Sequence, residues 1–363
     1  MTIDSISCNT MIYIHDDIVT NSELIILLDK ILDKNIVKKI YFDLDELSID
    51  VAISLSNFLS NTKTLTSFKI SVPKIDDDII LHLMDGLKQN NSIKILEINT
   101  DLSIINDNIF QFLEKSKKIK ELNLSDCKIS TTQCINLMNF LEMNHSIKRI
   151  NLSDNNINDA GIKSVVDLVI KNHNINQLDI SANNFGYQSI VGIAMMLDEG
   201  NLIYLNLALN EFEKHIDPFL ESLQKNKKLK WLNLSNIDSY IPWHKFATTI
   251  KNCNLSHLDI SWCSIGSSDL EKIINALSEN SKLKTIILAN NQINDDVVIS
   301  ICRALLKNNT ITKLNIHNTL VTEIGANHLL DFLTTKKNIL ELDFSYLDNK
   351  KLFLVYQRLS WWK

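Results

Sequence analysis

Glycine and proline are scarce in this chain. Of 363 residues only 7 are Gly and 3 are Pro, about 2% and 1% where average usage is roughly 7% and 5%. Flexible linkers and phosphate-cradling loops are rich in glycine. No Gly-x-x-x-x-Gly-Lys, His-Arg-Asp or Gly-x-Ser-x-Gly sequence occurs either. These absences argue against an enzyme and predict no cofactor.

Long apolar runs and paired cysteines are also missing. The densest apolar stretch, residues 24–28, is far shorter than the roughly 20 residues that span a bilayer. Residues 1–20 lack the basic start and apolar run of a secretory signal. The six cysteines contain no Cys-x-x-Cys pair, which favours reduced thiols over a disulfide framework. We therefore expect a cytoplasmic protein without membrane insertion.

The charge balance is acidic. The formal net charge is −6 and the sequence pI is about 5.9, whereas nucleic-acid binding needs concentrated Lys and Arg. With 45% hydrophobic and 22% charged residues, the chain has the composition of a globular protein. We expect a monomer that binds a protein partner and no nucleic acid.

The chain repeats itself along most of its length. Segments of the form apolar-x-x-apolar-x-apolar recur about every 27 or 28 residues, and an amphipathic stretch such as residues 160–171 follows each one. The segments begin at Val37, Leu65, Ile93, Ile119, Ile147, Ile175, Leu202, Leu229, Leu255, Leu283, Ile311 and Ile339. Strands that alternate with helices at a fixed period predict a solenoid.

The pattern resembles the leucine-rich repeat, and its length with a true helix is similar to the ribonuclease-inhibitor-like subclass. The resemblance implies an α/β fold, a right-handed solenoid or horseshoe with a parallel concave sheet and outer helices. We expect an N-terminal cap with a degenerate repeat (1–36), about twelve repeats of 26–28 residues (37–345) and a C-terminal cap (346–363). Counted from the first apolar residue, positions four and six of each repeat should point into the core.

Asparagine recurs at two places in the repeat. Position nine, where the chain leaves the strand, holds Asn155, Asn183, Asn210 or Asn291, with Cys127, Cys263 and Thr319 as replacements. In the family that this chain resembles, Asn, Cys and Thr are the usual occupants there. Further asparagines stand near the predicted helix ends at 61, 144, 172, 226, 252, 280 and 308, where we expect left-handed C-caps.

Acidic residues precede the predicted helices and lysines follow them. Macrodipole complementarity alone predicts this arrangement. The alternative is functional: an acidic rim and a basic rim that steer a charged partner.

Few residues suggest chemistry. His257 and Asp259 share one strand face near Cys263, but position nine should bury that thiol and deprive it of reactivity. His145 and His173 are one repeat apart, yet two histidines without carboxylate or thiolate support make a weak metal site. We expect no catalytic and no metal site.

The open face of the sheet carries the strongest binding signal. Position three of three consecutive repeats is Tyr204, Trp231 and His257, and Trp262 follows close by. Because neighbouring strands lie about 5 Å apart, the three side chains should form a row about 10 Å long. Aromatic residues with a polar group are common anchors of protein interfaces.

Two further sets complete the predicted binding surface. Position five is polar in most repeats, and near the row it is Asp179, Asn206, Asn233 or Asp259. The repeat from Leu229 is irregular; Pro242 should open a short helix, and Tyr240 and Trp243 are candidates to overhang the rim. The alternative for Trp243 is that it fills a gap in the core.

The sequence thus predicts a non-enzymatic protein–protein interaction module. Stand-alone repeats of this kind resemble effectors that intracellular bacteria deliver into host cells. A GTPase-activating or other regulatory protein is the alternative, although residues 350–363 contain no Asp or Glu where such activators carry an acidic tail. Trp361 and Trp362 either cap the last core layer or bind a partner.

Overall fold

The computed structural model describes residues 11–15, 19–103, 110–212, 216–237, 241–335, 339 and 341–344. The contacts divide the chain into two compact units, residues 1–184 and 185–363. In each unit short strands alternate with helices, as the period predicted. Among the described residues, no helix is both long and apolar enough to cross a membrane.

The first unit contains seven strands and six helices in its described part. They are β1 (Met11–His15), α1 (Asn21–Lys34), β2 (Lys39–Asp43), α2 (Ile49–Asn61), β3 (Ser67–Lys74), α3 (Asp77–Gln89), β4 (Ile95–Asp101), α4 (Gln111–Lys115), β5 (Glu121–Asn123), α5 (Thr131–Glu142), β6 (Arg149–Asn151), α6 (Asp159–Lys171) and β7 (Gln177–Asp179). The degenerate first repeat therefore forms a strand and a helix of its own.

The second unit continues the alternation. Its described elements are α7 (Tyr187–Glu199), β8 (Tyr204–Asn206), α8 (Asp217–Lys225), β9 (Trp231–Asn233), α9 (Trp243–Asn252), β10 (His257–Asp259), α10 (Ser267–Glu279), β11 (Thr285–Ile287), α11 (Asp295–Lys307), β12 (Lys313–Asn315), α12 (Glu323–Thr335) and β13 (Glu341–Asp343). Pro242 directly precedes α9, as expected. The predicted C-terminal cap, with Trp361 and Trp362, and the candidate Tyr240 lie outside the described residues.

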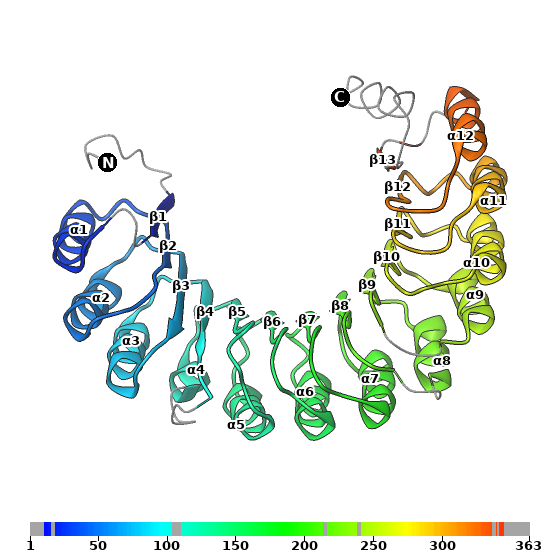
Figure 1. The fold of residues 1–363 in the computed structure, drawn as a ribbon. Coiled ribbons are helices and arrows are strands. Elements are labelled where there is room, and N and C mark those ends of the chain that lie inside the picture. The colour runs from blue at the N-terminus through cyan, green and yellow to red at the C-terminus, as the bar shows by residue number, and fades with distance from the viewer. Residues whose placement is uncertain are drawn as a thin grey trace. The chain divides into compact units, whose positions relative to one another are not determined.

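Within each unit every strand pairs in parallel with the next strand along the chain (Figure 1). The register joins equal positions of successive repeats: Leu205 pairs with Leu232, and Leu232 with Leu258. Strands line one side of each unit and helices line the other (Figure 1). The predicted fold class, a parallel-stranded α/β solenoid, is confirmed.

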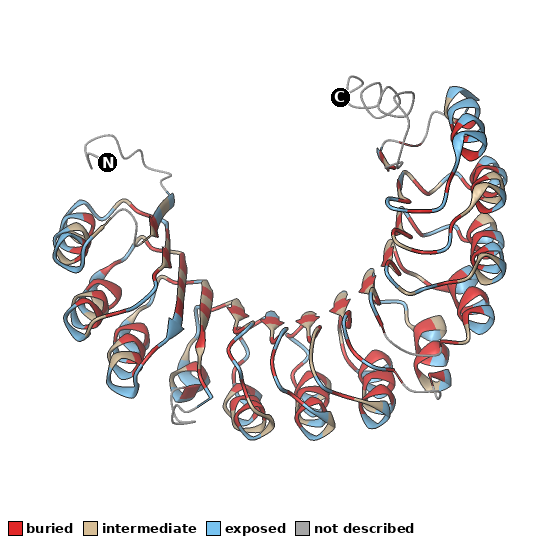
Figure 2. Ribbon diagram, in the orientation of Figure 1, coloured by how far each residue is buried: buried red, intermediate tan, exposed pale blue. Residues whose placement is uncertain are grey.

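The core of each unit lies between its strands and its helices. Positions four and six are buried as predicted; Leu232 and Leu234, for example, are both fully buried. The three-residue strands show an alternating burial in which the central residue is buried and its neighbours are partly exposed. Figure 2 shows the buried residues on the facing sides of strands and helices, and the exposed ones on the outer helix surfaces.

Position nine forms the predicted ladder of side chains that bond to the backbone. The Asn291 Nδ2 donates to the Ile260 carbonyl of the preceding repeat at 2.9 Å and to Leu288 O at 3.0 Å, and its Oδ1 accepts from the Ile265 amide. Where cysteine replaces asparagine, the Cys263 thiol donates to the equivalent carbonyl, Leu234 O, at 3.2 Å. Each repeat thus satisfies polar groups of the repeat before it.

The predicted left-handed C-caps at the helix ends are wrong. Asn280 and Asn308 have φ of −71° and −82°, in extended backbone. They bond across repeats instead: the Asn280 Nδ2 donates to Ile250 O at 2.7 Å, while its Oδ1 accepts from the Leu283 amide at 2.8 Å. The buried carbonyl at the end of the preceding helix needs a donor, and this need outweighs the tolerance of asparagine for left-handed backbone.

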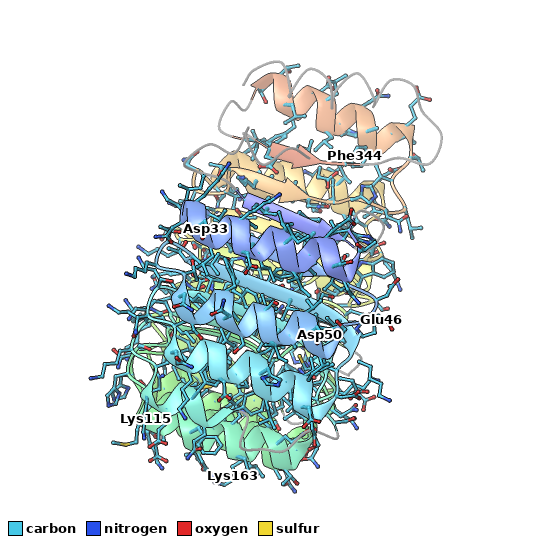
Figure 3. All side chains as sticks on the ribbon, turned by 90° about the vertical axis from the view of Figure 1, so that its left-hand side faces the viewer. Asp33, Glu46, Asp50, Lys115, Lys163 and Phe344 are labelled. Atoms are coloured by element: carbon cyan, nitrogen blue, oxygen red, sulfur yellow. The ribbon has the colours of Figure 1, made fainter. Side chains whose placement is uncertain are left out.

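Helix capping accounts for the charge pattern in the first unit. Thr20 and Glu23 form a reciprocal capping box at the start of α1, and the backbone bond from Thr20 lowers the pKa of the Glu23 carboxyl. Figure 3 shows Glu46 and Asp50 toward one side of this unit and Lys115 toward the other. Carboxylates near helix N-termini and lysines near C-termini are favourable without any ligand.

The hydrogen bonds of the position-nine ladder predict how much the free energy of unfolding falls when one of its asparagines is replaced. We expect Asn291→Ala to lower the free energy of unfolding by about 2–4 kcal/mol, because several buried backbone groups lose their partner. Asn291→Cys should cost clearly less, since thiols at 127 and 263 already donate to the equivalent carbonyls. Urea denaturation followed by circular dichroism measures both variants. Equal losses would contradict the ladder.

Candidate protein-binding surface

Position three of each repeat lies on the open face of the sheet, which none of the described helices covers. In the second unit this position holds Tyr204, Trp231, His257, Thr285 and Lys313 in successive paired strands. The first three are partly exposed, so the predicted row exists. We call Tyr204, Trp231 and His257 the aromatic row.

Tyr204 and Trp231 stack face to face. Their ring centroids are 4.1 Å apart and the rings are inclined by 12°. The stack follows from the register, because parallel pairing places equal positions of neighbouring repeats side by side. Such a pair contributes about 0.5–1.5 kcal/mol beyond its buried area, so the two rings form one continuous aromatic group on this face.

His257 continues the row beside Trp231. Partial burial, and then the positive charges of Lys313 and Lys284, lower the pKa of its imidazole. Its Nδ1 lies 2.9 Å from the Ser256 hydroxyl. The lowered pKa favours the neutral imidazole over its charged form.

Position three carries charged side chains in several other repeats. In the second unit Lys313 and Glu341 form an ion pair at 2.5 Å. In the first unit Arg149 pairs with Glu121 at 3.2 Å and bonds to Gln177 at 2.6 Å. Within the second unit, the aromatic row thus differs from the charged pair of Lys313 and Glu341 farther along the same face.

The polar residues at position five have a structural task. Asn233 Oδ1 accepts from the Ser235 amide at 2.8 Å, and Asp259 Oδ1 accepts from the Ser261 amide at 2.9 Å. Asn206 does the same for Ala208, and in the first unit Asp179 does so for Ser181. These side chains shape the end of each strand. Whether they also contact a partner stays a prediction.

The turn after each of the strands β5 to β12 contains a left-handed residue at position eight. Among the described residues these are Asp126, Asp154, Ala182, Leu209, Asn236, Trp262, Asn290 and Asn318, with φ between 50° and 58° for all but Trp262, at 59°. Asp and Asn tolerate this backbone, whereas a bulky residue there is unusual. Leu209 and Trp262 are the exceptions, and both are exposed, by 53% and 58%.

The sequence identified Trp262 but missed Leu209. The two side chains line a groove of about 400 Å³ at the carboxyl ends of β8, β9 and β10. We call it the turn groove. The signal that could have found Leu209 was the exchange of a polar residue for a large apolar one at position eight.

Trp243 is not on the accessible surface. It is only 8% exposed, and its ring packs edge-on against Phe246 with centroids 5.2 Å apart. Ile241, just before the helix, is buried as well. The structure therefore favours the core interpretation of Trp243 over partner contact, because the short helix α9 needs a large side chain to fill the layer.

The structure offers no support for thiol or metal chemistry. Burial raises the pKa of the Cys263 thiol to about 11, so the thiolate is scarce near neutral pH. In the described part of the chain no three His, Cys, Asp or Glu side chains cluster as metal ligands would. His257 and Asp259 share the open face of β10, but the Asp259 Oδ1 is engaged with Ser261.

Comparison with known proteins agrees with this architecture. A family model described as "Leucine Rich repeat" matches residues 115–132, 144–166, 251–273 and 279–302. The chain is a leucine-rich repeat protein, as its sequence resemblance indicated. The human "NACHT, LRR and PYD domains-containing protein 13" is 29% identical over 133 residues, which are 36% of this chain and 12% of that protein. The chain thus spans only a small part of that relative.

Solved structures with a similar fold share little sequence. The TLR13–ssRNA13 complex aligns with a TM-score of 0.52 at 16% identity, over 86% of this chain and 46% of that one. An internalin from Listeria monocytogenes aligns with a TM-score of 0.44 at 14% identity, over 91% and 90%. The yeast Rad7 and Elc1 complex gives 0.46 at 14%, over 84% and 85%.

The left-handed turn predicts a difference between two substitutions at Trp262. Both Trp262→Asn and Trp262→Ala remove the indole, but asparagine adopts a φ of 59° at lower cost than alanine does. We expect the asparagine variant to be more stable than the alanine variant by about 0.5–1 kcal/mol. Chemical denaturation of the two variants side by side measures this. Identical midpoints would show that the turn is not left-handed.

The raised pKa predicts that Cys263 is inert in the folded protein. At pH 8 a thiol with a pKa of about 11 is roughly a hundredfold less ionised than one with an ordinary pKa near 9. Alkylation by iodoacetamide should therefore be about a hundredfold slower than in urea at the same pH, as quantified on the Cys263 peptide by mass spectrometry. Rapid labelling of the folded chain would reopen a thiol-based activity.

Proposed function

We propose that this protein is a non-enzymatic interaction module that binds a protein partner through the open sheet face of its second unit. The observation that carries the proposal is the aromatic row, in which Tyr204 and Trp231 stack at 4.1 Å on a face that no helix in the described part of the chain covers. The core does not need these rings, because position four of the same strands, Leu205 and Leu232, already fills it.

The surroundings of the aromatic row suit a protein interface. Flat, rigid aromatic groups lose little conformational entropy on binding and are enriched among the residues that dominate interface energies. Asn206, Asn233 and Asp259 supply a polar surface beside them, with their outward geometry fixed by backbone bonds. An apolar centre with a polar border is typical of specific protein complexes.

The proposal extends to the setting in which the protein acts. The proposed cytoplasmic location is supported by the cysteine usage, since the five described thiols form no disulfide. Delivery into a host cell as an effector rests on the sequence resemblance alone. Both parts are proposals that fractionation of the source cells, and of cells exposed to them, would test.

The proposed interface is tested by removing the stack. Tyr204→Ala combined with Trp231→Ala should weaken partner capture by about 2 kcal/mol or more. The variant should stay folded with a modestly lower thermal unfolding temperature, because both side chains are partly exposed but their stacking is lost. Affinity capture from lysates of source and host cells, with quantitative mass spectrometry, compares the variant with the unaltered protein.

A matched control lies on the same face. Lys313→Ala combined with Glu341→Ala removes an exposed ion pair at position three, outside the aromatic row, and should leave capture intact. Capture that survives loss of the stack would refute the proposed interface. Acceleration of GTP hydrolysis in a panel of small GTPases would replace the proposal with the regulatory alternative.

A further inference from the structure

The turn groove is built from the turns of three successive repeats in the second unit. The residues that line it are Leu209, Asn210, Glu211, Asn236, Ile237, Trp262, Cys263 and Ser264. It lies at the carboxyl ends of β8, β9 and β10, whereas the aromatic row lies at their amino ends. The two features thus occupy opposite ends of the same strands.

The walls of the turn groove are apolar and stand in register. Leu209 and Trp262 hold the same position two repeats apart, with Asn236 between them at that position in the intervening repeat. The amides of all three donate to the next repeat, at 3.0, 2.9 and 3.0 Å for Leu209, Asn236 and Trp262. Strand spacing places the two walls roughly 10 Å apart, the width of one inserted side chain.

The floor and rim of the turn groove are polar, with a single sign of charge. Glu211 is exposed and is the one charged residue among the eight that line the groove. Asn236 and Ser264 add exposed amide and hydroxyl groups. A purely apolar guest would remove these groups from water without replacing their hydrogen bonds.

We propose that the turn groove binds a Lys or Arg side chain of the protein partner. The methylene stem would lie between Leu209 and Trp262, and the cationic head would reach the Glu211 carboxylate and the Asn236 amide oxygen. Long cationic side chains combine an apolar stem with a charged end in this way, and the indole face of tryptophan attracts cations. This inference rests on the proposed function and adds the chemistry of the partner.

The position of the groove sets how the partner presents this side chain. Leu209 comes five positions after Tyr204 in the chain, a path of at most about 17 Å. The partner should therefore carry its Lys or Arg within that distance of the apolar group that contacts the aromatic row.

The backbone conformation of Trp262 gives an independent reason to assign its side chain a binding role at the surface. Five of the eight left-handed residues at position eight in the described chain are Asp or Asn, the residues that this backbone favours. A tryptophan at φ 59° with more than half of its surface exposed is a disfavoured choice for the turn itself. Such choices concentrate at functional surfaces.

Peptides displayed on phage test the turn groove. We would use two random 12-residue libraries that are identical except that one omits Lys and Arg. We expect the immobilised full chain to enrich binders from the library with Lys and Arg at least tenfold over the other. Glu211→Gln and Trp262→Asn should each reduce retention of the selected peptides about tenfold, and retention should fall as salt rises.

Control substitutions outside the groove show whether the loss of peptide binding is specific to the groove residues. Glu271→Gln removes an exposed carboxylate on α10, and Leu320→Asn removes an exposed leucine that does not line the groove. Both should retain the peptides, and circular dichroism melts confirm that each variant is folded. Loss of binding in these controls equal to that in the groove variants would overturn the inference.

The remaining outcomes distinguish this inference from the proposed function. Peptides that Tyr204→Ala with Trp231→Ala releases, but that Glu211→Gln and Trp262→Asn retain, would overturn the groove and leave the interface standing. Equal enrichment from both libraries, or none from either, would likewise overturn the groove. Capture of a partner from lysate would still support the interface in each of these cases.

Discussion

Each repeat of this protein depends on its neighbour for hydrogen bonds that it cannot make alone. The Asn291 amide reaches back to the carbonyl of Ile260, and the Asn280 amide reaches back to Ile250. A buried carbonyl without a donor would cost about 1–3 kcal/mol. The chain therefore adopts one register between successive repeats within each unit, and that register decides which side chains become neighbours.

The aromatic row is a consequence of this register. Tyr204 and Trp231 are 27 residues apart in the chain, yet their rings stack because equal positions pair across β8 and β9. A shift by one residue would exchange core and surface positions. The same interactions that build the fold thus assemble the candidate interface. Core and surface use different positions of the repeat: positions four and six form the core, while positions three, five and eight are available for recognition.

The turns show how scarcity of glycine is accommodated. Among the described residues, every left-handed residue is a non-glycine residue. The position-eight amide is tied to the next repeat, as Trp262 N is to Ala289 O at 3.0 Å, and this bond holds the backbone in place whatever the side chain is. Asp and Asn fit such a turn readily, so the chain needs few glycines. A larger apolar residue at this position is presented to solvent rather than buried.

The sequence by itself determined the repeat, the parallel α/β solenoid, the ladder at position nine and the row of Tyr204, Trp231 and His257. These features follow from periodicity, because a period fixes which residues are equivalent. Only the tertiary structure decided the others. It placed Trp243 in the core, replaced the expected left-handed helix ends with bonds between repeats, and brought Leu209 and Trp262 to one groove. Each of these depends on which neighbouring atoms need a partner or leave a space, and periodicity alone does not encode that.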